Sequence, residues 1–281
     1  MILNLDSNFS PLGANAIEYS SFIFSGGEPH IKIQSDLTEV NEVTITTRIQ
    51  SFNDFGILLC AVDALKRMRV EKINVFLPYF PGARQDRVMV AGEALSVKVY
   101  ADILNSLSLN RITIFDPHSE VTPALLNDCE VVTNHKFIQK VLSKMNKDVL
   151  LISPDGGALK KIYKVSEFLD GIPVVECSKK RNVKNGQLEG FKVYEDDLKG
   201  KECLIVDDIC DGGGTFIGLA GELKKKNAGD LYLAVSHGIF SKGTEKLNSI
   251  FKKVFTTDSF KNVQEVEQIN LESIVEKITR W

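Results

Sequence analysis

Short apolar runs rich in β-branched residues alternate along the chain with longer stretches whose apolar positions recur at helical spacing. The first pattern is typical of buried strands, and the second of helices that bury one face. Strands are predicted at 73–77, 111–115, 149–152, 172–175, 204–206, 231–235 and 253–257. Helices are predicted around 58–68, 95–107, 135–147 and 216–223. This alternation indicates an α/β fold with mainly parallel sheets flanked by helices.

The alternation also carries a faint internal repeat. Residues 65–80 resemble residues 223–237 in their order of basic and apolar positions, and a further predicted strand follows each stretch. The helical pattern at 135–147 fits a connection between two sheets. At ~100–200 residues per domain, a length of 281 residues agrees with two domains. We therefore expect an N-terminal domain of residues 1–140 and a C-terminal domain of residues 141–281.

Composition narrows the classes of function. The chain has 34 Lys and Arg against 37 Asp and Glu, a net charge of −3, which disfavours a nucleic-acid partner because such proteins usually carry a basic surface. No apolar run approaches the ~18 residues of a membrane span, and no signal peptide is visible, so no membrane partner is expected. The 5 cysteines are scattered, as in proteins of a reducing cytoplasm, where we expect this chain to reside.

A glycine-rich loop follows the predicted strand at 204–206. The strand leads into Asp207 and Asp208, and the loop then contains Asp211, Gly212, Gly213, Gly214 and Thr215. Glycines let the N–H groups of such a loop point inward, and the start of the following helix adds partial positive charge, which suits a phosphate. The acidic pair would accept hydrogen bonds from sugar hydroxyls or hold a hydrated metal beside it. The alternative is a tight turn whose acids merely cap the helix.

A second cluster follows the predicted strand at 73–77. After a Pro-Gly turn, Arg84 and Arg87 flank Gln85 and Asp86 where a strand ends, and ligands of α/β sheets bind at such ends. Guanidinium groups offer forked donors to phosphate oxygens. The alternative is a solvated loop whose charges pair within the loop.

These motifs together resemble one enzyme family. The glycine loop looks like the phosphoribosyl diphosphate loop of the type I phosphoribosyltransferase fold, and the remaining motifs narrow the resemblance to ribose-phosphate diphosphokinase (phosphoribosyl pyrophosphate synthetase). The matching stretches are 24–28, 78–87, 116–120, 153–157, 179–181 and 204–215, in the family's order over nearly the whole chain. The resemblance implies two tandem phosphoribosyltransferase-like domains, the first binding ATP and the second ribose phosphate, with ATP at their junction.

The resemblance also implies a reaction. In this family the β,γ-diphosphate of ATP moves to the anomeric hydroxyl of ribose 5-phosphate, giving phosphoribosyl pyrophosphate and AMP. Arg84 and Gln85 match the positions that grip the triphosphate. Phe24, Gly26 and Glu28 match the adenine-binding segment, which a neighbouring subunit supplies, so a homo-oligomer is expected. Gly26 stands where the family usually has aspartate.

Metal and catalytic roles follow from the same resemblance. It makes His118 and Asp155 ligands of Mg2+, directly or through water. It places a catalytic lysine and an arginine two positions later on a basic loop, which Lys179 and Arg181 match, with Lys180 as a rival for the lysine. Arg181 is also expected to contact ribose phosphate, together with the glycine loop and its acidic pair.

One departure opens alternatives. Gly212 stands where the family commonly has a threonine that contacts the 5-phosphate. Loss of that hydroxyl also opens space, so the acceptor could be a ribose 5-phosphate unit that is already esterified, such as ADP-ribose. A third hypothesis is a non-catalytic homologue that regulates an active synthetase. A base-transferring phosphoribosyltransferase is disfavoured, because Arg84 and His118 would have no task.

Overall fold

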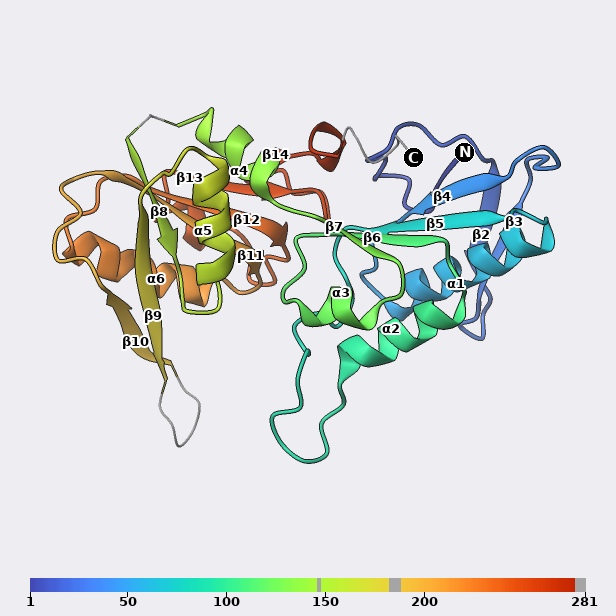
Figure 1. The fold of residues 1–281 in the computed structure, drawn as a ribbon, viewed down its shortest axis with the longest axis horizontal. Helices are drawn as coiled ribbons and strands as arrows, with labels where there is room; N and C mark the ends of the chain where they lie inside the picture. Colours follow the sequence, from blue (N-terminus) through green and yellow to red (C-terminus); the bar gives the residue numbers. More distant parts are fainter. Residues whose placement is uncertain (146–147, 182–187, 276–281) are drawn as a thin grey trace. The chain divides into compact units, whose positions relative to one another are not determined.

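The computed structural model describes residues 1–145, 148–181 and 188–275, which form two compact units (Figure 1). Residues 1–133 and 270–275 make the first unit, and residues 134–269 the second. The division precedes helix α4 (His135–Leu142), which the predicted boundary between residues 140 and 141 would cut. The helix belongs to the second unit because it packs against that unit's sheet and fully buries Phe137, Ile138 and Val141.

The first unit contains a five-stranded parallel sheet. Its spatial order is β1 (Ile2–Asn4), β4 (Glu42–Thr46), β5 (Lys72–Leu77), β6 (Arg111–Phe115) and β7 (Cys129–Val132). Helices α1 (Phe52–Arg67) and α2 (Ser96–Ser106) lie on one side of it in Figure 1, and α3 (Val121–Leu125) and the 3-10 turn η1 (Leu271–Ser273) complete the unit. The predicted β5, β6, α1 and α2 are confirmed, whereas β1, β4 and β7 are additional.

Local chemistry explains where α1 begins. Ser51 accepts a hydrogen bond from the backbone N–H of Asp54, and the Asp54 carboxylate accepts one from the backbone N–H of Ser51. This reciprocal capping satisfies two amides that have no partner within the helix. The buried face that follows, Phe55, Leu58 and Leu65, joins the core beneath the sheet.

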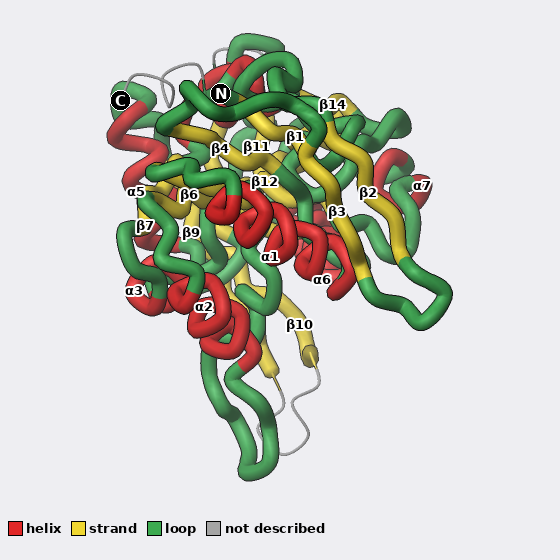
Figure 2. Tube along the Cα trace, turned by 90° about the vertical axis from the view of Figure 1, so that its right-hand side faces the viewer, coloured by secondary structure: helices red, strands yellow, loops and turns green. Residues whose placement is uncertain are grey.

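An antiparallel hairpin stands apart from this sheet. It comprises β2 (Tyr19–Ile23) and β3 (Pro29–Ile33), and it runs alongside α1 (Figure 2). Ile31 is buried in the core with α1, whereas Phe22, Ile23 and Phe24 at the far end are about half exposed. The hairpin therefore presents an apolar tip.

The second unit contains a seven-stranded sheet. Its order is β10 (Leu188–Val193), β9 (Val174–Arg181), β8 (Val149–Ser153), β11 (Glu202–Cys210), β12 (Leu231–Gly238), β13 (Lys253–Thr257) and β14 (Glu267–Ile269). The pair β10 and β9 is antiparallel, and all other neighbouring pairs are parallel. The five predicted strands of this half are confirmed, although β9 begins after Pro173 and continues to Arg181.

Helices cover both faces of this sheet. Phe216, Leu219 and Leu223 of α6 (Gly214–Lys225) pack with Ile205 and Leu233 in one core. Helix α5 (Leu159–Phe168) packs on β8 and β9 together with α4, and α7 (Glu245–Asn248) packs near β13. Both units thus have the predicted α/β architecture with mainly parallel sheets. No helix in the described part of the chain combines the length and apolar character needed to cross a bilayer.

Candidate active site

A tight turn sets the first cluster of polar residues at the end of β5. Phe80 accepts a hydrogen bond from the N–H of Ala83, and Gly82 has φ of +73°, as type II turns with Pro-Gly in the middle require. A Cβ at Gly82 would lie 3.2 Å from backbone atoms of Ser96 and Val97 at the start of α2. Only glycine therefore combines this conformation with this close approach, which holds the next residues against α2.

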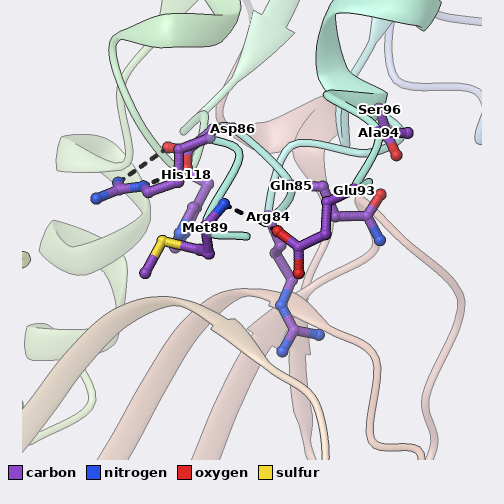
Figure 3. Close-up of a pocket in the computed structure, with 9 residues that line it drawn as sticks. Arg84, Gln85, Asp86, Met89, Glu93, Ala94, Ser96 and His118 are labelled. Carbon is purple, nitrogen blue, oxygen red and sulfur yellow. Dashed lines mark hydrogen bonds and ion pairs between the residues drawn. The ribbon is translucent and has the colours of Figure 1, made fainter. Parts of the chain in front are cut away.

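The residues after the turn line a cavity of about 620 Å3 within the first unit (Figure 3). The backbone carbonyl of Gln85 accepts from the N–H of Val97, which ties this segment to the first turn of α2. The lining residues are Arg84, Gln85, Asp86, Arg87, Met89, Glu93, Ala94, Ser96 and His118. The cavity thus joins the predicted triphosphate residues Arg84 and Gln85 with the predicted metal ligand His118.

The charges in this cavity are not equivalent. Asp86 is almost fully buried and accepts from both Nε and Nη2 of Arg87, at 2.9 and 3.3 Å. The hydrogen bond from Arg87, together with one from Ser119 and the charge of His118, lowers the pKa of Asp86 although burial opposes the shift. Pairing within the loop therefore holds for Arg87. In Figure 3, Arg84 and Gln85 project away from Asp86.

His118 reaches the cavity from the end of β6. Asp116 follows that strand with φ of +37°, a region that aspartate tolerates better than most residues, and its N–H donates to Val132 at the end of β7. The chain then turns outward, and His118 is exposed. Position and exposure leave the imidazole accessible from the cavity.

The predicted adenine segment does not line this cavity. Phe24, Gly26 and Glu28 form the turn of the β2–β3 hairpin, where Phe24 N–H donates to the Glu28 carbonyl at 2.9 Å. The Phe22 and Phe24 rings meet edge to face at 4.7 Å, and Phe24 is 52% exposed. A Cβ at Gly26 would lie 2.5 Å from a carboxylate oxygen of Glu28, so an aspartate there would force Glu28 to move.

The glycine loop of the second unit joins β11 to α6 as predicted. Asp207 and Asp208 lie within the C-terminal half of β11, and Gly213 has φ of +75° at the N-cap of α6. A Cβ at Gly213 would lie 3.1 Å from Leu247 of α7, so this position also combines a left-handed backbone with close packing. The loop is therefore a well-defined turn at the helix start, with Thr215 in the first turn of α6.

The surroundings of the acidic pair favour the protonated form of Asp207. Burial raises the pKa of Asp207 well above its usual value, and the charge and side-chain hydrogen bond of Asp208 raise it further. Asp208 is itself buried, and its backbone N–H donates to Asp207 at 2.9 Å. A raised pKa weakens the repulsion that Asp207 would exert on an anion in the glycine loop, and both side chains can still hydrogen-bond hydroxyl groups.

A second loop, residues 239–244 after β12, packs against the glycine loop. The strand register pairs Cys210 with Gly238, so the two loops leave the sheet side by side. Ser241 Oγ donates to the Asp211 carboxylate at 2.6 Å, and the Ser241 N–H donates to the Asp211 carbonyl at 3.1 Å. Sequence reasoning missed this loop. The available signal was that this loop follows the predicted strand at 231–235, the next strand in sequence after 204–206, and that it is bordered by glycines at 238 and 243.

Two predicted site residues meet directly in the second unit. Lys179 Nζ lies 2.5 Å from Oδ2 of Asp155, and both side chains are largely shielded from solvent. The other oxygen of Asp155 accepts from the N–H groups of Gly157 and Ala158. Burial alone would raise the pKa of Asp155, but the hydrogen bond and charge of Lys179 and these amides hold it below its usual value. The carboxylate is thus ionised and oriented.

Other predicted residues fall partly outside the described structure. The backbone of Lys180 and Arg181 ends β9, but their side chains are not among those described. Residues 182–187, which contain the rest of the basic run, also lie outside it. In the described part of the chain, no group of three or more His, Cys, Asp and Glu side chains is arranged to hold a metal ion.

Comparison with known proteins agrees with this arrangement. The family model described as the N-terminal domain of ribose phosphate pyrophosphokinase matches residues 9–107, and the phosphoribosyl transferase domain model matches residues 127–272. The chain is 31% identical over 270 residues to the ribose-phosphate pyrophosphokinase of Mycoplasma genitalium. This alignment covers 91% of this chain and 80% of that protein. It is 29% identical over 245 residues to the enzyme of the same name from Corynebacterium efficiens, which covers 84% of this chain and 74% of that protein.

A solved structure matches the fold of both units. The phosphoribosylpyrophosphate synthetase of Mycobacterium smegmatis aligns with a TM-score of 0.80 and 23% identity, over 92% of this chain and 88% of that chain. The similarity confirms two tandem phosphoribosyltransferase-like domains. With the relatives and the two family models, it shows that the chain belongs to the ribose-phosphate pyrophosphokinase family of enzymes.

Proposed function

We propose that this chain transfers the β,γ-diphosphate of ATP to the anomeric hydroxyl of ribose 5-phosphate, with Mg2+, giving phosphoribosyl pyrophosphate and AMP. The observation that carries the proposal is the glycine loop at the end of β11. Its residues Asp211 to Thr215 turn directly into α6, so their N–H groups and the start of the helix favour an anion there. The acidic pair Asp207 and Asp208 lies beside them in β11 to accept hydrogen bonds from sugar hydroxyls.

The acceptor half of the site is assigned to the second unit. The loop amides and the Thr215 hydroxyl bind the 5-phosphate, while Asp207 and Asp208 bind the ring hydroxyls. An arginine at position 181 is assigned to the ribose phosphate on the family resemblance. Binding at two ends of the sugar fixes its anomeric hydroxyl, and such positioning is a large part of the acceleration of a two-substrate reaction.

The donor half is assigned to the first unit. Arg84 and Gln85 bind phosphate oxygens of ATP at the cavity, while Arg87 is balanced by Asp86 and holds the loop. The exposed hairpin turn with Phe24, Gly26 and Glu28 binds the adenine of a neighbouring subunit. Its absence from the cavity lining of its own chain is what such sharing requires, so we propose a homo-oligomer.

The donor set fits Mg2+ that arrives with the nucleotide. Mg2+ keeps several waters and binds through one or two carboxylates plus substrate phosphates. Asp155 offers an ionised, oriented oxygen, and His118 offers an exposed imidazole at the cavity. Mg2+ bound at either residue would neutralise charge on the phosphate oxygens. Asp155 in turn holds Lys179 in place through their ion pair.

The chemical step forms a bond between the anomeric oxygen and the β-phosphorus and breaks the bond from that phosphorus to the bridging oxygen of AMP. The proton of the anomeric hydroxyl is released to solvent. Charge develops on phosphoryl oxygens, so cations in a fixed position stabilise the transition state. Lys179 and Arg181 are assigned this role. Because Asp155 orients the Lys179 ammonium, the lysine needs little reorganisation when charge develops.

An assay of the purified protein, with no other protein present, tests whether the reaction occurs. Incubated with ATP, Mg2+ and ribose 5-phosphate, it is expected to form AMP and phosphoribosyl pyrophosphate in equal amounts, measured by 31P NMR or chromatography. Absence of AMP with every acceptor would favour the non-catalytic regulatory homologue. An Arg84→Ala variant is the matched control, and it should lose ATP affinity while ribose 5-phosphate binding is retained.

A second acceptor is carried by the observation at Gly212. This position offers no side-chain hydroxyl to a terminal phosphate, and the side chain closest to it is exposed Lys242. The missing hydroxyl should therefore weaken binding less for a ribose 5-phosphate unit that is already esterified, such as ADP-ribose, than for free ribose 5-phosphate. Side-by-side turnover with ribose 5-phosphate and ADP-ribose separates the two. A strong preference for the free sugar phosphate excludes the second acceptor.

A further inference from the structure

The stem of Lys242 covers the glycine loop. A Cβ built on Gly212 would lie 3.3 Å from Cδ of Lys242 and 3.4 Å from its Cε. The methylene groups of this lysine therefore occupy the space that a larger residue at position 212 would need. Because Cε carries the ammonium group, the contact also brings a positive charge to the loop.

The base of this lysine is fixed. Ser241 makes two hydrogen bonds to Asp211, and the N–H groups of Ile239 and Phe240 donate to the Cys210 carbonyl. On the other side, Gly243 N–H donates to the Phe240 carbonyl, and Leu247 packs on Gly213. The neighbours of Lys242 in sequence are thus bonded to the residues that form the glycine loop. Its backbone position is set, while the side chain is exposed.

A phosphate bound in the glycine loop would need a nearby cation to balance the negative charge of the acidic residues beside it. Asp207, Asp208 and Asp211 flank the loop, and these three acidic groups place negative charge beside a bound phosphate. Backbone amides and a helix start contribute only partial charges. Among the described residues, Lys242 has no ion-pair partner. Its ammonium is therefore available to an anion in the loop.

We infer that Lys242 binds the phosphate on O5 of the acceptor ribose and replaces, with a charge, the side-chain contact that Gly212 lacks. The inference rests on the proposed function, because it assigns the glycine loop to the acceptor phosphate. An ammonium group is a compact point charge with three donors, which suits a phosphate and gives little preference among sugar hydroxyls. Lys242 is thus a binding and specificity residue, and it takes no part in the diphosphate transfer.

The test compares three variants of the full chain by calorimetric binding and by initial rates. Lys242→Gln should weaken ribose 5-phosphate binding by roughly tenfold to a hundredfold, the range of a charge-assisted hydrogen bond. Its KM for this acceptor should rise while kcat and the KM for ATP stay within about threefold. Lys242→Arg should retain most of the affinity. Lys225→Gln is the matched control, because Lys225 lies at the opposite end of α6, about 16 Å away by the helical rise, and should bind as wild type.

A comparison of ribose, ribose 5-phosphate and ADP-ribose as acceptors identifies the group that Lys242 contacts. The Lys242→Gln defect should vanish with ribose, which has no phosphate. A defect with ribose 5-phosphate assigns Lys242 to a terminal phosphate, and a defect found only with ADP-ribose assigns it to an esterified one. Either supports the inference. Equal binding of both phosphorylated acceptors by wild type and Lys242→Gln would overturn it.

The two proposals fail in different ways. If wild type forms AMP and Lys242→Gln has an unchanged KM for the acceptor, the proposed function stands and Lys242 has no role in binding. If wild type forms no AMP with any acceptor, the proposed function fails. In that case ribose 5-phosphate binding still reports on Lys242, because its loss in Lys242→Gln alone supports the phosphate contact.

Discussion

Lys179 and Asp155 form the contact on which the catalytic assignment depends. The ion pair spans 2.5 Å, and the carboxylate is held from its other side by two backbone amides. This arrangement supports the proposal of Lys179 as the catalytic lysine, because a fixed ammonium stabilises developing charge without first having to be ordered.

Lys179→Ala should reduce kcat by roughly a hundredfold to a thousandfold, as removal of one preorganised donor does in other enzymes, with the KM for ATP nearly unchanged. Steady-state rates and calorimetric ATP binding measure the two effects. Lys180→Ala is the control and should turn over like wild type. Unchanged turnover in Lys179→Ala, or an equal loss in both variants, would remove the assignment.

The raised pKa of Asp207 in the acidic pair leads us to expect that the folding stability of the chain depends on pH. Burial raises the pKa of Asp207 in the folded chain, so the folded state holds this proton at pH values where the unfolded state has lost it. Stability contributed by the protonated form is fully present below the ordinary aspartate pKa of 3.8, which applies to the unfolded chain, and it declines as the pH rises toward the raised pKa of the folded chain.

Asp207→Asn should therefore raise the melting temperature at pH 8 by roughly a few degrees and change it little at pH 4. Thermal denaturation at both pH values measures this, and activity should fall because a contact to the sugar is altered. Asp197→Asn is a control of opposite sign. The Lys199 amide and then Asn227 lower the pKa of Asp197, so this variant should not gain stability at pH 8. A gain for Asp207→Asn that is larger at pH 4 would contradict the account.

At the scale of elements, the turn before Arg84 sets the donor cavity. Gly82→Ala forces a side chain into φ of +73° and places its Cβ 3.2 Å from the backbone of α2. The backbone cost alone is about 1 kcal/mol, and the crowding adds to it. We expect a loss of about 1–2 kcal/mol in unfolding free energy, with weaker ATP binding because Arg84 and Gln85 shift.

The matched control for this turn is Gly171→Ala. Gly171 has φ of +81° with nothing within 4 Å of its Cβ position, so it carries the backbone cost without the crowding. Denaturant unfolding and ATP calorimetry on both variants separate the two contributions. Equal ATP affinity in Gly82→Ala and wild type would show that the turn does not position the phosphate residues.

The helices and strands also show which parts of the fold can be predicted from the sequence alone. Helices α1, α2 and α6 and strands β5, β8 and β11 were predictable because each buries a regular face or a continuous apolar run. Strand β9 is longer than its apolar part, since the polar residues Ser178 to Lys180 stay extended by pairing with β10. Such pairing depends on the neighbouring strand, for example Lys180 with Gly190, and leaves no pattern of apolar positions within β9 itself.

The same limit applies to the site. The glycine loop and the Arg84 segment were predictable because their chemistry is contained in a few consecutive residues. The contact between Gly212 and Lys242 was not, because it follows from the register that places the ends of β11 and β12 together. The pairing of Arg87 with Asp86 was one of two alternatives, and the burial of Asp86 decides it.

At the scale of the whole molecule, the proposed function assigns each ATP site residues from two chains. If the hairpin turn with Phe24 serves the ATP site of a neighbouring subunit, two inactive variants can complement each other. A Phe24→Ala chain keeps Lys179 intact, and a Lys179→Ala chain keeps Phe24 intact. Mixed oligomers should therefore contain sites with both groups, and their activity should exceed that of either variant alone.

Mixing after reversible dissociation, followed by AMP formation, measures this complementation. Phe24→Ala mixed with wild type is the control for exchange of subunits. Lack of recovery in a mixture shown to exchange would mean that each chain completes its own ATP site.

The central claim is that the backbone amides of residues 211–215 cradle the phosphate of a sugar. A crystal structure of the chain with ribose 5-phosphate tests it most directly. The account predicts the phosphate oxygens about 3 Å from amide nitrogens of this loop, with the Lys242 ammonium on the same group. A glycine loop without phosphate, and the sugar phosphate bound elsewhere on the chain, would contradict it.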